Sequence, residues 1–160
     1  MNKEKFDYLG ITKFHQAGYL GQGITFVSRE SLSPHGKKVF NVMQQICPEA
    51  NLQYRIDYKK VPKDVDIYTT SMFSPMDKIQ RYIDKGYELY ESGTFLCCAV
   101  GNYDDEKQTF LSTLPFWTAI GACYYTQGKL RRAEYSSITN NIDYMSITNM
   151  DTEFGIFSGT

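Results

Sequence analysis

The stretch TFLCCAV, from Thr94 to Val100, is apolar at every position after the first threonine. A strand with one face in water alternates apolar and polar side chains, whereas a strand covered on both faces is a continuous apolar run. Strands of the second kind occur in parallel sheets that carry helices on both sides. We therefore expect TFLCCAV to be a central strand of an α/β fold: a three-layer α/β/α domain with a mostly parallel sheet.

The rest of the chain alternates between strand and helix patterns, as such a fold requires. Short runs of β-favouring residues predict strands at Ile24–Ser28, from Leu52 (LQYRIDY), from Val65 (VDIYTTSM), from Trp117 (WTAIGACY), from Asp143 (DYMSI) and at Phe154–Phe157 (FGIF).

Helical spacing of apolar residues predicts two helices. The first follows Ser33-Pro34, stops near Cys47-Pro48, and has Val39, Val42, Met43 and Ile46 on one face. The second starts at Ser74-Pro75 and ends at Gly93, because Ser is a favoured N-cap, Pro a favoured first residue and Gly a favoured stop. Its expected buried stripe is Met76, Ile79, Ile83, Tyr87 and Tyr90.

Length and charge exclude several classes of protein. A chain of 160 residues is most simply one domain, 1–160. A net charge of -1 gives no basic footprint, so nucleic acid is not an expected partner. No run approaches the roughly 20 apolar residues of a membrane span, and MNKEKFDYLG lacks the apolar core of a secretory signal. We expect a cytoplasmic protein without a membrane partner.

The four cysteines, Cys47, Cys97, Cys98 and Cys123, contain no C-x-x-C pair. Zinc sites need convergent cysteine and histidine ligands, and the spacing here does not supply them. We expect the cysteines to be small buried hydrophobic residues, and neither a metal nor another cofactor is predicted.

Polar residues that could carry chemistry follow the predicted strands. Glu30 comes just after the first strand, His35 lies at the start of the first helix, and Asn102 follows the apolar strand. The chain ends on Ser158-Gly159-Thr160. Because sites in parallel α/β sheets lie at the carboxyl ends of strands, we expect these residues to gather there.

In this order the motifs resemble those of the subtilisin-like serine peptidases (subtilases). GQGITFVSRES is similar to the family's opening strand, and HGKKVFNVMQQICPEANL to its His-Gly-Thr helix and the strand entry that follows. GTFLCCAVGN is similar to the strand that ends in Ala-Gly-Asn, and the final SGT to the lead-in to Gly-Thr-Ser. The resemblance covers nearly the whole chain.

The resemblance implies three roles. His35 matches the general base, Asn102 the side-chain donor of the oxyanion hole, and Glu30 the position of the acid that orients the histidine. It also implies that the chain ends one residue before the catalytic serine, so that the C-terminal part of the domain, with the nucleophile's helix, is missing. Ser158 precedes the nucleophile's position and is not a substitute.

Several positions depart from the family's pattern. The acid is Glu rather than Asp, it precedes His35 by only five residues, and Lys37 stands where the family has Thr. The substrate-binding stretch Ser-Leu-Gly-Gly is replaced by Ser71-Met72-Phe73-Ser74, in which Phe73 could block the groove.

Three functions therefore stay open. The chain can be the front part of a serine endopeptidase, inactive as it stands, or a pseudoprotease that binds polypeptides without cutting them. It can also be an assembly protein whose uncovered core docks a partner or a second copy of itself. The family often binds calcium, but no site can be assigned: Asp104, Asp105 and Glu106 are interpreted as a solvated loop.

Overall fold

The computed structural model describes residues 2–31, 33–54, 58–71 and 78–159. Its helices are α1 (Lys3–Tyr8), α2 (Ile11–Gln16), α3 (Pro34–Ile46) and α4 (Ile79–Glu91). Its strands are β1 (Thr25–Ser28), β2 (Asn51–Tyr54), β3 (Ile67–Thr70), β4 (Phe95–Ala99), β5 (Thr118–Thr126), β6 (Lys129–Arg132) and β7 (Tyr144–Ile147). Short 3-10 turns cover Tyr58–Lys60 and Leu111–Thr113.

The strands form one seven-stranded sheet in the order β2-β1-β3-β4-β5-β6, with β7 also paired to β5. Every pairing is parallel except that of β5 with β6. Strands β1, β3 and β4 therefore end at the same edge of the sheet. This confirms the mostly parallel α/β sheet predicted from the apolar strand.

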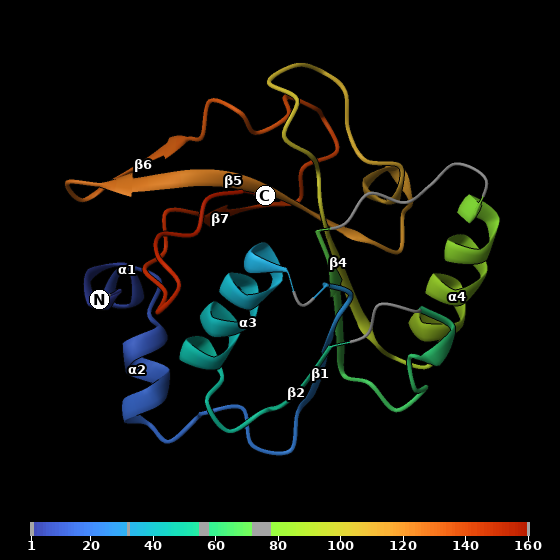
Figure 1. The fold of residues 1–160 in the computed structure, drawn as a ribbon, viewed down its shortest axis with the longest axis horizontal. Helices are drawn as coiled ribbons and strands as arrows, with labels where there is room; N and C mark the ends of the chain where they lie inside the picture. The colour runs from blue at the N-terminus through green and yellow to red at the C-terminus, as the bar shows by residue number, and fades with distance from the viewer. Residues whose placement is uncertain (1, 32, 55–57, 72–77, 160) are drawn as a thin grey trace.

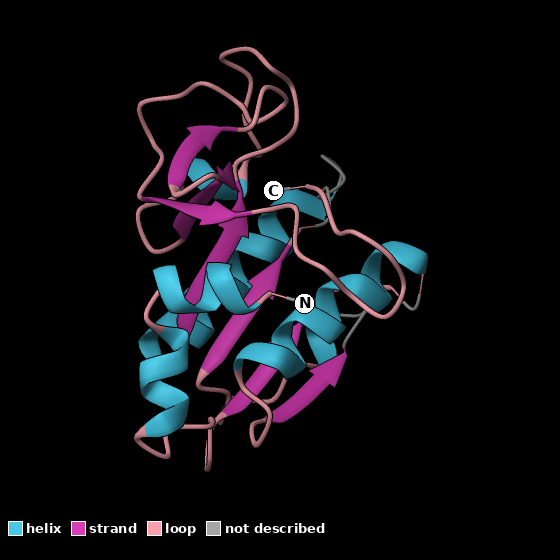
Figure 2. Cartoon of the chain, turned by 90° about the vertical axis from the view of Figure 1, so that its left-hand side faces the viewer, coloured by secondary structure: helices cyan, strands magenta, loops and turns pink. Residues whose placement is uncertain are grey.

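Helices α3 and α4 lie on opposite sides of the sheet, and Figure 2, at right angles to Figure 1, shows the strands in the middle of the molecule. The larger core cluster lies on the α4 side and includes Val27, Tyr68, Leu89, Leu96 and Trp117. A smaller cluster on the other side joins Cys123, Ile147 and Met150 to residues of α1 and α3. The result is the predicted three-layer arrangement.

Helix α3 begins as its sequence predicts. The hydroxyl of Ser33 accepts a hydrogen bond from the backbone N–H of Gly36 at 3.2 Å, and Pro34 is the first helical residue. The helix ends at Ile46, just before Cys47-Pro48. Its N-terminal end lies at the edge of the sheet where β1, β3 and β4 end (Figure 1).

Helix α4 exists, but its predicted buried stripe is wrong at its C-terminal half, whereas Ile79 and Ile83 are half-buried. The buried residues are Tyr82, Gly86 and Leu89, while Tyr87 and Tyr90 are 52% and 50% exposed. The difference arises at Gly86, where an added Cβ would lie 3.0 Å from Nε1 of Trp117. A glycine brings this face close to the sheet, although it carries no apolar side chain to mark the face in sequence. The predicted start at Ser74-Pro75, and Met76 with it, fall outside the described residues.

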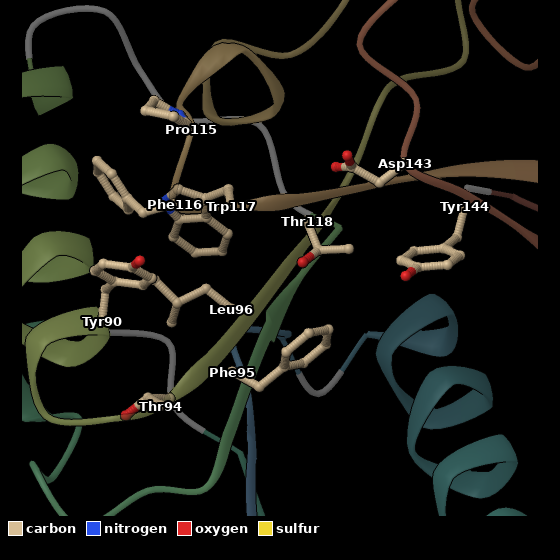
Figure 3. Close-up of a pocket in the computed structure, with 10 residues that line it drawn as sticks. All are labelled: Tyr90, Thr94, Phe95, Leu96, Pro115, Phe116, Trp117, Thr118, Asp143 and Tyr144. Carbon is tan, nitrogen blue, oxygen red and sulfur yellow. The ribbon is translucent and has the colours of Figure 1, made fainter.

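Strand β4 lies between β3 and β5, as expected of a central strand. At the start of β4, however, only one face of the strand is covered: Leu96 is buried, whereas Phe95 is 51% exposed. Neighbouring side chains of a strand point to opposite faces, and Figure 3 shows Leu96 and Phe95 doing so. The expectation of cover on both faces is thus wrong at Phe95.

One predicted strand is absent and one strand is new. FGIF is a turn, with the backbone N–H of Gly155 donating to the carbonyl of Thr152, and only Phe157 makes an isolated bridge, to Met150. Strand β6 was not predicted; it forms because Gln127 and Gly128 both adopt positive φ angles, which suits a tight hairpin turn.

Candidate functional site: an acid and a histidine joined by a serine

The end of β1 and the start of α3 are held together by a glycine. A Cβ on Gly36 would lie 1.8 Å from the carbonyl oxygen of Ser31, so only glycine allows this approach. The side chain of Tyr54, at the end of β2, donates a hydrogen bond to the carbonyl of Gly36. These contacts fix the first turn of α3, and with it His35, beside Glu30.

Glu30 is buried, and its carboxylate is directed to Ser71. The backbone N–H of Ser71 donates to Oε1 of Glu30 at 2.9 Å, and the Ser71 hydroxyl donates to the same oxygen. Ser71 directly follows β3, which pairs with β1, so the two residues leave neighbouring strands at the same edge. A buried carboxylate needs such donors, since an unpaired one would be strongly destabilising.

The imidazole of His35 completes the group. Its Nε2 lies 3.1 Å from Oγ of Ser71 and 3.8 Å from Oε2 of Glu30. The His35 side chain is 46% exposed, whereas the Glu30 side chain is 2% exposed. An accessible histidine is thus attached to a buried acid, and the hydroxyl of Ser71 joins the two.

Ser71 is the residue whose role the sequence prediction missed, because it was assigned only to the substrate-binding stretch. The sequence held no local signal for this role, because Ser71 meets Glu30 only through the pairing of β3 with β1. The remainder of that stretch, including Phe73, falls outside the described residues.

Asn102 lies three residues beyond β4, at the same edge of the sheet as Glu30 and Ser71, and is exposed. The preceding Gly101 has φ +123°, and a Cβ there would lie 2.6 Å from the ring of Tyr103. Glycine is therefore required where the chain turns out of β4. The structure brings His35 and Glu30 into contact; the oxyanion role of Asn102 stays a prediction.

The C-terminal turn lies next to the histidine. A Cβ built on Gly159 would be 3.8 Å from Cε1 of His35, and the rings of His35 and Phe157 are 5.5 Å apart. Figure 1 shows the C-terminus beside the N-terminal end of α3. The backbone N–H of Gly159 donates to Oγ1 of the buried Thr148 at 3.0 Å, which holds the turn in place.

A mostly apolar groove runs from this turn across the α3 side of the sheet. Val39, Cys97, Ile120, Phe157 and Gly159 are among the residues that line it. Further along the same side, near the amino ends of β4 and β7, Phe95 and Tyr144 are 51% and 67% exposed. Apolar surface is thus open to solvent between the helix that carries His35 and the sheet.

A second pocket lies at the opposite edge, where β4, β5 and β7 begin. Figure 3 shows Tyr90 and Phe116 on its α4 side and Tyr144 on the α3 side, with Asp143 between. Asp143 is engaged, because its Oδ2 accepts the backbone N–H of Ala119 at 2.7 Å. Since sites in parallel sheets form at the carboxyl ends of strands, the candidate site is the one at the edge that carries Glu30.

The thiols are unsuited to catalysis. Burial raises the pKa of Cys98 far above its usual range, and burial also raises the pKa of Cys47, Cys97 and Cys123. Cys98 and Cys123 are buried as expected, whereas Cys47 and Cys97 are half-buried. All four are free thiols.

Among the described residues, no group of three or more His, Cys, Asp or Glu side chains could hold a metal ion. The acidic loop is paired with cations instead: Asp105 lies 3.0 Å from Lys107, and Asp104 lies 3.4 Å from Arg132. Within the same part of the chain, no helix is long and apolar enough to cross a membrane.

Comparison with known proteins finds relatives in structure but not in sequence. No family model matches, and no curated protein is a significant match. A lanthipeptide protease matches with a TM-score of 0.65 and 10% identity, over 86% of this chain and 59% of its own length. The prenylagaramide maturation protease PagA matches with a TM-score of 0.64 and 14% identity, over 89% of this chain and 69% of its own.

A third match, the patellamide maturation protease PatG, has a TM-score of 0.60 and 11% identity, over 94% of this chain and 72% of its own. The fold is subtilisin-like. At these sequence identities the comparison shows the fold alone. This chain also spans only 59% of the length of the lanthipeptide protease. The site must therefore be argued from its own residues.

Proposed function

We propose that this chain carries the acid–base end of a subtilisin-like serine endopeptidase site and is inactive as its 160 residues stand. The observation that supports the proposal is the position of Gly159: a Cβ built on this residue would lie 3.8 Å from Cε1 of the His35 ring. In the serine-peptidase mechanism the histidine takes the proton of a serine hydroxyl and later gives it to the leaving amine. A serine that followed the Ser-Gly-Thr turn would lie close to that histidine.

In this role His35 is the general base and Glu30 orients it through Ser71. The buried carboxylate stabilises the positive charge that develops on the imidazole during proton transfer. Asn102, exposed at the same edge, is the proposed side-chain donor to the oxyanion. The substrate class is polypeptide, since peptide-bond hydrolysis is the chemistry that this set of residues serves.

The present orientation of His35 supports the inactive state. Nε2 faces Ser71 and Glu30, whereas the serine-peptidase mechanism requires Nε2 to face the nucleophile and Nδ1 to face the acid. Ser71 is not positioned as a nucleophile, because its hydroxyl donates its proton to Glu30. The imidazole must turn about its side-chain bonds before it can act as the base.

A second candidate is a pseudoprotease that binds polypeptides without cutting them. The observation that favours it is the same contact of Nε2 with Ser71, which occupies the nitrogen that catalysis needs. In that case the exposed apolar groove is the binding surface, and a second copy of the chain is one possible occupant of the uncovered sheet.

The deciding experiment is the intact mass of the protein from its native source, compared with 18.4 kDa for these residues. A heavier species that a fluorophosphonate probe labels, with labelling lost in His35→Ala, would support the peptidase proposal. In that species Asn102→Ala should lower kcat by about 10²–10³. A mass of 18.4 kDa, or a heavier species that the probe does not label, would overturn the peptidase proposal and favour the binding role.

A further inference from the structure

Asn2 precedes helix α1, yet its side chain serves another part of the chain. An asparagine at this position usually accepts a hydrogen bond from the first turn of its own helix, but the Asn2 side chain makes no such bond. Asn2 is only 2% exposed, whereas its neighbour Lys3 is exposed. A buried amide needs hydrogen-bond partners, and Asn2 finds one of them 149 positions away in the sequence.

The partners of Asn2 are Gln45, on α3, and Asp151. Nδ2 of Asn2 donates to Oε1 of Gln45 and to the carbonyl of Asp151, both at 2.7 Å. Oδ1 of Asn2 accepts from the backbone N–H of Asp151 at 2.8 Å. Nearby, the ammonium of Lys5 donates to the carbonyl of Asn149. The start of the chain therefore holds the residues just beyond β7 against α3.

From there the C-terminal segment, residues 149–157, runs along one polar face of α3, and Figure 1 shows it between α1 and α3. Three side chains of the helix bond to it in turn: Gln45 to the carbonyl of Asp151 at 3.0 Å, Asn41 to the backbone N–H of Glu153 at 3.3 Å, and Lys38 to the carbonyl of Ile156 at 2.9 Å. Residues three and four apart share a face of a helix, and His35 is three residues before Lys38.

The far end of the segment meets His35. The ring of Phe157 lies 5.5 Å from the ring of His35, and Gly159 follows in the turn beside it. The same face of α3 thus carries His35 and guides the segment that ends next to it. Where the turn lies relative to His35 depends on where the segment is held at its start.

We propose that Asn2 is a positioning residue of the candidate site. By joining Asp151 to Gln45, it sets the place of the C-terminal segment along α3 and hence the place of the Ser-Gly-Thr turn beside His35. Its importance for catalysis rests on the proposed function, but the contacts themselves do not. Asn2 acts through the segment and has no direct part in proton transfer.

Asn2→Ala in the 160-residue chain tests the proposal, because it removes both donors and the acceptor. We expect hydrogen exchange of the Gly159 amide to become about tenfold faster or more, since that amide opens with the segment. The backbone N–H of Arg29, bonded to the carbonyl of Thr69 at 2.8 Å in the sheet, should exchange as in the wild type. Equal acceleration of both amides would mean that Asn2 only stabilises the whole fold, and this would overturn the proposal.

The NMR signal of the His35 ring is the second measurement, because the neighbouring ring of Phe157 shifts it. Asn2→Ala should move this signal. Gln45→Met keeps the length of the side chain, removes the partner of Asn2, and should act in the same direction; it is the variant to use if Asn2→Ala does not fold.

Lys3→Ala is the matched control, because it breaks only the exposed ion pair with Asp7 and should leave the Gly159 amide and the His35 signal as they are. Unchanged exchange of Gly159 and an unmoved His35 signal in Asn2→Ala would contradict the positioning role. These measurements need no peptidase activity, so failure of the proposed function and failure of this inference are distinguishable.

Discussion

Nε2 of His35 lies 3.8 Å from Oε2 of Glu30, and the hydroxyl of Ser71 lies between the two side chains, 3.1 Å from the same nitrogen. The acid is nearly inaccessible to solvent, whereas the histidine side chain is 46% exposed. An acid that orients a base from a buried position is what proton transfer requires. The consequences can be tested residue by residue.

Glu30→Gln and Ser71→Ala should each move the NMR resonances of the His35 ring nitrogens, because each removes a partner of the imidazole. Glu30→Gln keeps the size of the side chain but removes its charge, and Ser71→Ala removes the hydroxyl that joins the two groups. The protein has two histidines, so His15, whose Nε2 lies 2.8 Å from the carbonyl of Ile46, is an internal control. Resonances of His35 that stay in place in both variants would show that the contact is incidental.

Gly36→Ala should destabilise the fold and displace His35. A Cβ at this position would lie 1.8 Å from the carbonyl oxygen of Ser31, so the first turn of α3 has to move. Overpacking of this kind costs about 1–3 kcal/mol, measurable by urea unfolding. Lys37→Ala, at an exposed neighbouring position, is the control and should stay within about 0.5 kcal/mol of the wild type. Equal stability of the two variants would mean that α3 does not need the glycine.

Thr148→Val should loosen the C-terminal turn. The substitution keeps the shape of the side chain but removes the hydroxyl that accepts from Gly159 and from the Tyr135 hydroxyl. We expect a loss of about 1–3 kcal/mol and faster hydrogen exchange of the Gly159 amide. Thr126→Val, at an exposed position, is the matched control. Unchanged hydrogen exchange of the Gly159 amide in Thr148→Val would show that Thr148 does not hold the C-terminal turn.

Stability at alkaline pH should depend on Tyr54. Burial, with a smaller effect of the Glu30 charge, raises the pKa of Tyr54 to about 12 from its usual 10.0. The folded state therefore holds the phenolic proton more tightly than the unfolded state. This contribution is fully present below pH 10 and is lost as the pH rises toward 12. The free energy of unfolding of Tyr54→Phe, measured with urea, should depend less on pH over that range than that of the wild type. An equally steep loss of stability in the variant would contradict the raised pKa of Tyr54.

The sequence predicted the sheet well because its evidence is local. TFLCCAV predicts the central position of β4, although not the exposure of Phe95, and Ser33-Pro34 marks the start of α3. The α4 face was predicted wrongly because Gly86, the residue that contacts Trp117, carries no apolar side chain to count. FGIF has the composition of a strand, but the turn at Thr152–Gly155 leaves only Phe157 in a bridge.

The candidate site was predictable in part. Glu30 and His35 could be paired from sequence order and from resemblance to a family. The role of Ser71 could not, because it arises from the pairing of β1 with β3, which brings together residues 41 positions apart.

We propose that Glu30 and His35 form the acid–base part of a peptidase site and that the folded 160-residue chain is inactive. The most direct test is to incubate the folded 160-residue chain with a fluorophosphonate probe and measure covalent labelling by intact mass. The account predicts no labelling. Labelling that is lost on heating, in His35→Ala and in Ser71→Ala would contradict it, because Ser71 would then be a working nucleophile.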